Sequence, residues 1–448
     1  MRPFAILAGL VAVLLVIALQ ACGLTSQPAQ PLAVVAPQRD EGVAPVALSA
    51  STAASRVEEP AGKTAVAPAL PEAWPSELFF VRNTGDAQGE MTAYDMSTGR
   101  ARFKLPPGIP SPDGKHYYAA QPTETGTLLR IYELGTGRHE KRVAFDGLWA
   151  LTGVSWSGRW VAMTRVPGED EQQAWAKTKT WKTDIQILDT ASGQAAHTLT
   201  LDGNFEVETI SPSGDALFLI EHLPAVNPNH YLIRLFDLRI ESLVPGALRD
   251  KSATDEVMAG LAWDGLASPN GRWLLTLYLS TLRNTAFVHT LDLSDKYPVC
   301  IDLPSGSGDF NQLKYYSLAL APSGWRLFAA NAVLGVVAEI SLSSRSVTRR
   351  ATFQPRSFGA ANASNPQSQL SRSVVSKDGS KLYFTSGLDV WVYDTASGEV
   401  DGPFLINGRI SALGLSGDGK RLYVAAEKQP LLVFDTQSGL ALNFPQAN

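Results

Sequence analysis

Short hydrophobic runs recur from about residue 76 to the C-terminus, and two kinds of polar turn end them alternately. The first kind is Asp-x-x-x-Gly or a variant, and its eight copies begin at Asp95, Glu133, Asp189, Asp237, Asp292, Ser341, Asp394 and Asp435. The second kind is Ser-Pro-Asp-Gly or a variant, and its seven copies begin at Ser111, Ser155, Ser211, Ser268, Ala321, Ser376 and Ser416. Two turn types that alternate every 35–50 residues or so indicate a repeat architecture.

One complete unit can be followed through residues 409–444. A strand over 410–415 meets the Gly417-Asp418-Gly419 turn, and a second strand covers 422–425. A third strand over 431–434 precedes the turn at 435–439, and a fourth covers 440–444. These runs are rich in β-branched and aromatic residues, and no stretch of the body shows a long helical period. Each unit is therefore expected to have four antiparallel strands, named A to D here in chain order.

The polar residues of both turns have a structural explanation. Asp and Ser side chains accept or donate hydrogen bonds to the backbone a residue or two ahead, and Gly adopts the positive φ that closes a hairpin. The repeated aspartates are therefore expected to build turns and not to bind a metal.

Four-stranded antiparallel units that repeat radially form a β-propeller, so the predicted fold class is all-β. The segments at 111–118, 376–384 and 392–398 resemble the repeats of bacterial YVTN-type and WD-repeat-like β-propellers. The resemblance covers residues 76–444 and implies the architecture, but it implies almost nothing about activity.

The number of blades is left between eight and seven. The first turn type counts eight units, whereas the second counts seven, because residues 78–105 supply strands B, C and D without an evident strand A. Eight is favoured, with a strand near 63–67 or an incomplete first blade closing the ring, and seven is the alternative.

The N-terminus has the layout of a secretory signal, with Arg2, an apolar run over 4–19 and the ending Leu19-Gln20-Ala21-Cys22. That ending resembles a bacterial lipoprotein signal, which implies cleavage before Cys22 and lipid, palmitate included, on Cys22; an ordinary signal or an uncleaved anchor is the alternative. Residues 22–74 are rich in Ala, Pro, Val, Ser and Gln and read as a disordered tether. The predicted domains are the signal at 1–21, the tether at 22–74 and the propeller at 75–448.

Composition excludes some classes of partner. Loss of Arg2 with the signal leaves 37 of the 38 Lys and Arg against 43 Asp and Glu, a net charge of −6. Mild acidity without a basic cluster argues against nucleic acid and against electrostatic docking on anionic lipid. The only cysteine besides Cys22 is Cys300, which lies in an apolar run and is expected to be a buried, inert side chain.

The long connections point to one face as the functional one. A–B and C–D turns lie at one end of the strands, so the longer B–C and D–A loops share the other end, where binding usually resides. One B–C loop carries Trp175 and Trp181, which either anchor a partner or pack the loop onto the body, and its acidic-to-basic order could start a short helix. Another carries His222 and His230, the densest His and carboxylate cluster, although its spacing matches no standard zinc site.

These features favour a lipid-anchored, extracytoplasmic propeller that binds a protein, peptide or polymer at the cell envelope, at the cell membrane or the outer membrane. No nucleophile elbow, phosphate loop or metalloprotease motif occurs, and no catalytic residue, metal or other cofactor is expected. The alternative is a propeller enzyme of the lactonase, lyase or amine dehydrogenase type, with its site at the loop-face mouth of the central channel.

Overall fold

The computed structural model describes residues 77–82, 90–225, 230–249, 259–305, 310–355, 372–406 and 408–444. The predicted signal segment, Cys22, the tether and the strand near 63–67 lie outside these residues. Most of the predicted D–A loops lie outside them as well.

Within the described residues the chain forms eight antiparallel sheets, seven with four strands and one with three. The strands of the first four sheets are β1 (Leu78–Arg82), β2 (Met91–Asp95), β3 (Arg100–Leu105); β4 (Ile109–Pro110), β5 (His116–Pro122), β6 (Gly126–Glu133), β7 (His139–Asp146); β8 (Trp149–Val154), β9 (Trp160–Arg165), β10 (Lys182–Asp189), β11 (Gln194–Asp202); and β12 (Phe205–Ile210), β13 (Ala216–His222), β14 (Tyr231–Asp237), β15 (Ser242–Leu243). Those of the last four are β16 (Leu261–Ala267), β17 (Trp273–Ser280), β18 (Thr285–Asp292), β19 (Tyr297–Asp302); β20 (Tyr316–Leu320), β21 (Arg326–Asn331), β22 (Val336–Ser341), β23 (Ser346–Thr352); β24 (Ser373–Val375), β25 (Lys381–Thr385), β26 (Asp389–Asp394), β27 (Val400–Leu405); and β28 (Ile410–Leu415), β29 (Arg421–Ala426), β30 (Leu432–Asp435), β31 (Ala441–Leu442).

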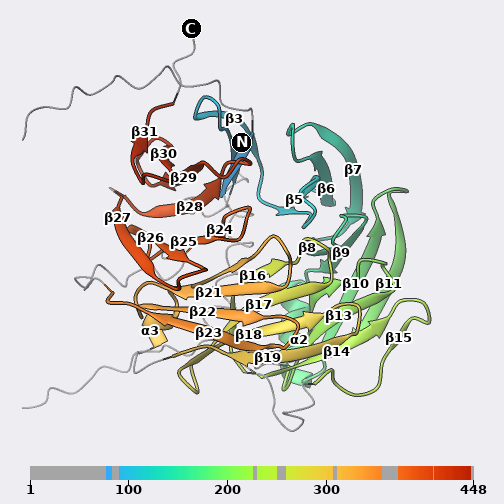
Figure 1. The fold of residues 1–448 in the computed structure, drawn as a ribbon. Helices are drawn as coiled ribbons and strands as arrows, with labels where there is room; N and C mark the ends of the chain where they lie inside the picture. The colour runs from blue at the N-terminus through green and yellow to red at the C-terminus, as the bar shows by residue number, and fades with distance from the viewer. Residues whose placement is uncertain are drawn as a thin grey trace, which may run out of the picture. The chain divides into compact units, whose positions relative to one another are not determined.

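The sheets follow one another around a ring, and the fold is an eight-bladed β-propeller. The first strands of most neighbouring sheets contact each other, as β8 does β12 and β20 does β24, and β28 of the last sheet contacts β1 of the first. Figure 1 shows the first sheet, in blue, beside the last, in dark red. The all-β prediction and the favoured count of eight are confirmed, and seven is wrong. The blades are numbered 1 to 8 in chain order below.

Blade 1 is the three-stranded sheet of the described residues, and its strands correspond to B, C and D as the sequence indicated. Its seam with blade 8 is a shared hydrophobic cluster that includes Phe79, Val81, Tyr423 and Val433. The ring of Phe79 lies 6.3 Å from that of Tyr423, and a Cβ at Gly414 would come within 2.5 Å of the Phe79 ring. Side-chain packing therefore joins the two ends of the described ring.

The A–B turns have the hydrogen bonds that the sequence predicted. In six of the seven, the hydroxyl of the first serine accepts the backbone N–H five residues on, as Ser111 does from His116 and Ser376 from Lys381. The glycine that ends each of these turns has φ between 71° and 75°. Hydrogen bonds from Ser376 and Ser380 lower the pKa of Asp378 to about 2. The turn aspartates are thus held by hairpin contacts.

The C–D turns share one geometry although three of them lack glycine. The fifth residue has positive φ in all eight turns. It is glycine in five of them, and in the other three it is Glu241, Lys296 or Arg345, with φ between 50° and 54°. Left-handed backbone at a non-glycine residue is unfavourable, so the surrounding hairpin must enforce it in these blades.

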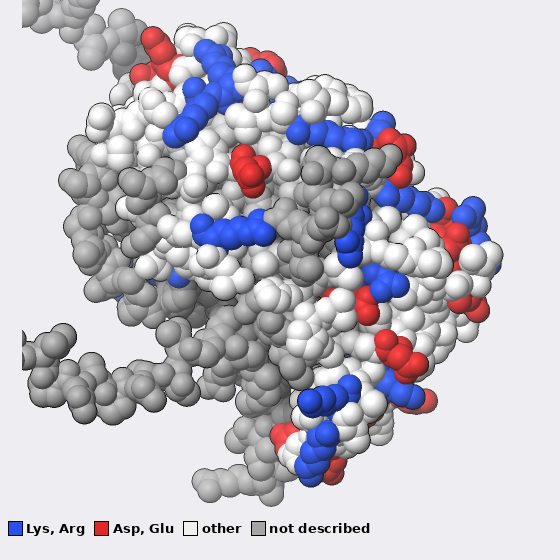
Figure 2. All heavy atoms as spheres, turned by 90° about the horizontal axis from the view of Figure 1, so that it is seen from below, with Lys and Arg blue, Asp and Glu red and all other residues white. Residues whose placement is uncertain are grey.

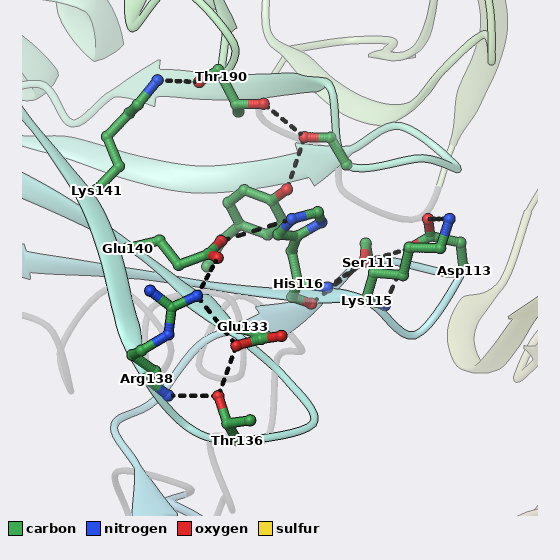
Figure 3. A network of polar contacts seen from close by, with 12 residues as sticks. Ser111, Asp113, Lys115, His116, Glu133, Thr136, Arg138, Glu140, Lys141 and Thr190 are labelled. Carbon is green, nitrogen blue, oxygen red and sulfur yellow. Dashed lines mark hydrogen bonds and ion pairs between the residues drawn. The ribbon is translucent and has the colours of Figure 1, made fainter.

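Polar contacts also link neighbouring blades at the turn face, as Figure 3 shows for blades 2 and 3. The Tyr118 hydroxyl donates to the Gly158 carbonyl at 2.6 Å, and the Lys141 ammonium donates to the Thr190 carbonyl at 2.7 Å. The same view shows Arg138 between Glu133 and Glu140, at 3.2 and 3.3 Å. These charged side chains stabilise turns and seams, so they have a structural role at the turn face.

The Phe79→Ala variant tests the seam between blades 8 and 1. Truncating a buried Phe leaves a cavity and typically costs about 3–5 kcal/mol, so we expect a clearly lower unfolding midpoint in urea or on heating. The control is Leu440→Ala, whose side chain is 67% exposed. Equal stability of the two variants would contradict a seam that rests on this cluster.

Candidate functional site

The helix α2 (Glu169–Thr178) forms most of the B–C connection of blade 3. Its first turn is acidic and its last turn contains Lys177, which suits the helix dipole and confirms the predicted short helix. A second, four-residue helix, α3 (Phe310–Leu313), precedes β20. Both lie on the face opposite the tight turns, which we call the loop face.

Arg165, at the end of β9, holds α2 against the blade. Its guanidinium donates two hydrogen bonds to the Glu171 carboxylate, at 2.7 and 2.8 Å, and one to Asp184 at 2.6 Å. These contacts lower the pKa of Glu171, and Arg165 and Thr200 together lower that of Asp184 against its burial. No residue of α2 is buried, so this charged contact is its main visible attachment.

Trp175 and Trp181 lie at the loop face and contact each other. Their ring centroids are 5.7 Å apart with the planes tilted by 59°. Both side chains are half-buried. The pair therefore contributes to packing around α2 and still presents aromatic surface to solvent. This is compatible both with packing of the loop onto the body and with anchoring of a partner.

Among the described residues, His222 and His230 contact different partners. The His222 side chain is buried and its Nε2 lies 3.0 Å from Oε1 of Glu206. The neighbouring Glu221 forms an ion pair with Arg234. His230 is half-buried, and its carbonyl accepts the Leu223 N–H at 2.9 Å.

The innermost strands of four blades contain a β-bulge at matching positions. The extra residue is Thr152 in β8, Glu208 in β12, Trp263 in β16 and Ser411 in β28. A bulge redirects a side chain and often lies near a functional site. These positions are where the inner wall departs from regular strand geometry.

A belt of polar contacts joins the innermost strands of blades 5 to 8. Asp264 accepts the Leu318 N–H at 3.2 Å, the hydroxyls of Ser317 and Ser373 are 2.5 Å apart, and Arg372 donates to the Ser411 carbonyl at 3.1 Å.

Burial dominates the electrostatics of this belt. It raises the pKa of Asp264 above its usual value, against the Leu318 amide and the positive charge of Arg372. Burial likewise lowers the pKa of Arg372, which Asp264 opposes. A carboxyl with a raised pKa beside an arginine in an inner wall is a candidate contact for a polar ligand.

The innermost strands of the blades form the inner wall of the ring. Trp156 lies at the turn-face end of this wall, opposite the loop face. It stands in the A–B turn of blade 3, where most other blades have proline. Its Nε1–H donates to the Ser268 carbonyl of blade 5 at 3.1 Å, and a Cβ at Gly271 would come within 2.7 Å of its ring. The indole therefore reaches past blade 4 to blade 5 at the turn-face end of the inner wall.

A second polar cluster lies in the seam between blades 4 and 5. It brings together Glu208 of β12, His222 of β13, Tyr231 of β14, Tyr278 of β17 and His289 of β18. Within the described part of the chain, thirteen buried side-chain N or O atoms have no hydrogen-bond partner. Six belong to this cluster, two each from Glu208 and His222 and one each from Tyr231 and His289. Of these, the Nε2 of His222 is within ion-pair distance of Glu206, and the Tyr231 hydroxyl interacts with that of Tyr278.

Contacts between aromatic rings connect the residues of this cluster. Oε1 of Glu208 lies 3.7 Å from Nε2 of His289, and the His289 ring lies perpendicular to that of Tyr278 at 6.0 Å. The Tyr278 ring lies 5.7 Å from that of Tyr231, which is 6.3 Å from His222. Side chains from two blades thus meet in one buried region.

Desolvation governs the ionisation of this cluster. Burial raises the pKa of Glu208 to about 8 and lowers that of His289 to about 4. It also raises the pKa of both phenols far above the usual value; the neighbouring Tyr278 phenol adds to this for Tyr231, and the Glu208 charge adds to it for both. At neutral pH these groups are therefore largely uncharged.

Cys300 corrects one expectation from the sequence. It is exposed, not buried, because β19 is the outer strand of blade 5. Its Sγ lies 3.8 Å from Nδ1 of His289. The cysteine therefore borders the cluster from the outside.

Sequence reasoning identified His222 but missed Glu208, Tyr231, Tyr278 and His289. Those residues are spread over the 82 positions from 208 to 289, and only the packing of two blades brings them together. One signal in the sequence could have pointed to this cluster. Glu208 places a carboxyl group at the bulge position of an innermost strand, where the other bulged blades have threonine, tryptophan or serine.

Charge gives no further site in the view of Figure 2, where basic and acidic side chains of the described residues are interspersed over a broad uncharged surface. Over the same described ranges, no three His, Cys, Asp or Glu side chains are grouped to hold a metal ion. None of the helices that the structure describes is long and apolar enough to cross a bilayer.

Comparison with known proteins finds similar solved structures but no matching family or curated sequence. No family model matches the chain, and no curated protein sequence matches it. Among solved structures, the dihydro-heme d1 dehydrogenase NirN in complex with DHE is similar at 17% identity with a TM-score of 0.49, over 84% of this chain and 75% of that one. Apo AztD from Citrobacter koseri is similar at 13% identity with a TM-score of 0.49, over 82% and 93% of the two chains.

A third similar structure is the β-propeller domain of Cps50 (Swd1) from Myceliophteria thermophila, at 10% identity with a TM-score of 0.38, over 72% of this chain and 94% of that one. With identities of 17% or less and TM-scores of 0.49 or less, these likenesses say nothing of what this chain binds or does.

Arg165→Ala tests the attachment of α2. We expect chymotrypsin to cleave at Trp175 and Trp181 several-fold faster in this variant while the melting temperature of the ring stays close to wild type. Because Arg165 lowers the pKa of Glu171 and Asp184, its hold is present above their usual pKa near 4 and is lost as pH falls below it. The difference between the wild type and Arg165→Ala should therefore narrow in acid, where pepsin, which is active at low pH, replaces chymotrypsin. Lys177→Ala is the control, and equal cleavage of both variants would refute the role of Arg165.

Proposed function

We propose that this chain is a lipid-anchored, extracytoplasmic propeller that binds a protein, peptide or polymer of the cell envelope at its loop face. The observation that carries the proposal is the polar inner wall, which Trp156 partly covers at the turn face. A ligand that enters from the loop face meets the belt of Asp264, Arg372, Ser317 and Ser373.

The second support is the placement of α2. Its pair of half-buried tryptophans lies on the same face as the approach to the inner wall, and exposed aromatic side chains are frequent anchors in protein interfaces. Many polar side chains of the turn face are engaged in hairpins and seams, as Figure 3 shows for blades 2 and 3.

The location rests on the sequence around Cys22. A signal that ends in Leu-x-Ala-Cys, followed by a Pro- and Ala-rich segment, suits a globule held at some distance from a membrane. Which membrane this is depends on the envelope of the host. A net negative charge makes nucleic acid a poor partner for the same surface.

A propeller enzyme is the second candidate, and one observation favours it. Asp264 combines a raised pKa with a neighbouring arginine in the inner wall, which is an arrangement found in acid–base catalysis. Turnover of a lactone or an amine by the wild type that Asp264→Asn abolishes without loss of folding would support the enzyme over the binding protein.

A photo-crosslinking residue placed on each face of blade 3 tests the binding face. Ala176 in α2 and Ser192 in the C–D turn are both exposed and belong to the same blade. In intact envelopes, we expect the crosslinker at position 176 to yield a defined adduct and the one at 192 to yield none, as seen by gel shift and mass spectrometry. Adducts from position 192 alone, or from neither position, would contradict the proposal.

Cys22→Ser tests the anchor. Since lipid on this cysteine is the proposed membrane attachment, the variant should lose metabolic labelling with palmitate and move from the membrane to the soluble fraction. Trp181→Ala serves as the control for folding and export, because it leaves Cys22 intact. Unchanged labelling and fractionation of the serine variant would show that the anchor is elsewhere.

A further inference from the structure

The seam between blades 4 and 5 differs from the others at its bulge residue. Thr152 bonds to the Thr164 hydroxyl at 2.8 Å, Trp263 donates to the Lys314 carbonyl at 2.9 Å, and Ser411 donates to the Ala425 carbonyl at 3.3 Å. Glu208 occupies the same position with a side chain that is 5% exposed and two carboxylate oxygens that have no hydrogen-bond partner. An unpartnered buried carboxyl is costly, which suggests that a ligand completes the site.

The unpartnered atoms around Glu208 form a donor set. The Nε2 of His289 also lacks a hydrogen-bond partner, and the Tyr278 ring contacts those of both Tyr231 and His289. We propose that Glu208, Tyr231, Tyr278 and His289 bind a ferric ion between blades 4 and 5. A carboxylate and two phenolates are hard oxygen donors that suit a small, highly charged cation, and imidazole is a common ligand of iron.

The spacing of the first two donors fits such an ion. At 3.7 Å, Glu208 Oε1 and His289 Nε2 are too far apart for a good hydrogen bond. Two ligands at about 2.0–2.1 Å from one ion, at the 90° angle of octahedral coordination, lie about 2.9 Å apart. An approach of about 0.8 Å would therefore bring both atoms onto one metal.

Charge balance favours a trivalent ion over a divalent one. One carboxylate and two phenolates carry three negative charges, which a ferric ion neutralises, whereas zinc would leave a net negative charge in the seam. Uncompensated charge is expensive to bury between packed blades. Tyr231 and Tyr278 are each 2% exposed, so the balance of charge matters here.

The surroundings supply orientation and a route of entry. Cys300 Sγ lies beside Nδ1 of His289, which leaves Nε2 directed toward Glu208. On the other side, the carboxylate of Glu206 is 64% exposed and lies next to His222, whose ring packs against Tyr231. An ion can thus meet an exposed carboxylate first and then the buried donors.

The experiment is titration of the purified full-length protein with ferric citrate, followed by desalting and measurement of iron. We expect one iron per chain and a visible phenolate-to-iron charge-transfer band. Tyr278→Phe should remove most of the band, and Glu208→Gln should weaken binding by roughly 100-fold, at least as much as outer-shell changes do. Zinc chloride, titrated in parallel, should bind more weakly and should not depend on Tyr278.

The control is Tyr117→Phe, which alters a buried tyrosine of blade 2 whose hydroxyl bonds to the Pro106 carbonyl. It should keep the wild-type band, and circular dichroism should show all variants folded. If a variant unfolds, His289→Gln provides a second change in the donor set. No stoichiometric iron, a band that survives every variant, or zinc bound more tightly through the same residues would overturn the proposal.

Discussion

A twisted four-stranded sheet has two apolar faces, and neither can remain in water. In this protein each blade buries both faces against its neighbours, so the stability of any blade depends on the closure of the whole ring. A change of about 1.4 kcal/mol in the free energy of unfolding alters the ratio of folded to unfolded protein ten-fold, and the burial of one large side chain contributes more than this. The seam of Phe79 and Tyr423 therefore supports all eight blades, although it lies between the first and the last.

Closure of the ring also determines where function can reside. The turn face is occupied by Ser and Asp hydrogen bonds that every blade needs, and Trp156 extends this structural role across the inner wall. Departures from the repeat are found elsewhere: α2 with its Arg165 contact, the belt that contains Asp264, and the bulge at Glu208. At each of these places a blade carries a residue that regular blade geometry does not require.

Much of the architecture could be predicted from sequence, because hairpin chemistry is local. The turn at Ser376 and the strand that follows it can be recognised from ten residues, and eight units could be counted from the C–D turns even where Glu241 or Lys296 replaces glycine. The sites are different in kind. His222 was noticed for its neighbours in sequence, yet its relevant contacts are Glu206 and Tyr231, and His289 had no local signal at all. The exposure of Cys300 could not be foreseen either, since an apolar run does not reveal which strand of a blade is outermost.

The seam between blades 8 and 1 combines side-chain packing with a hydrogen bond from the Gly417 N–H to the Glu77 carboxylate at 2.9 Å, and it brings the two ends of the described ring together. At the other end of the chain, the ring of Phe444 lies against Gly99 of blade 1. A short linker between these ends would make a continuous circle of blades. The chain could then be reopened at another seam, and this circular permutation would place the tether beside a different blade without altering the packing of the ring.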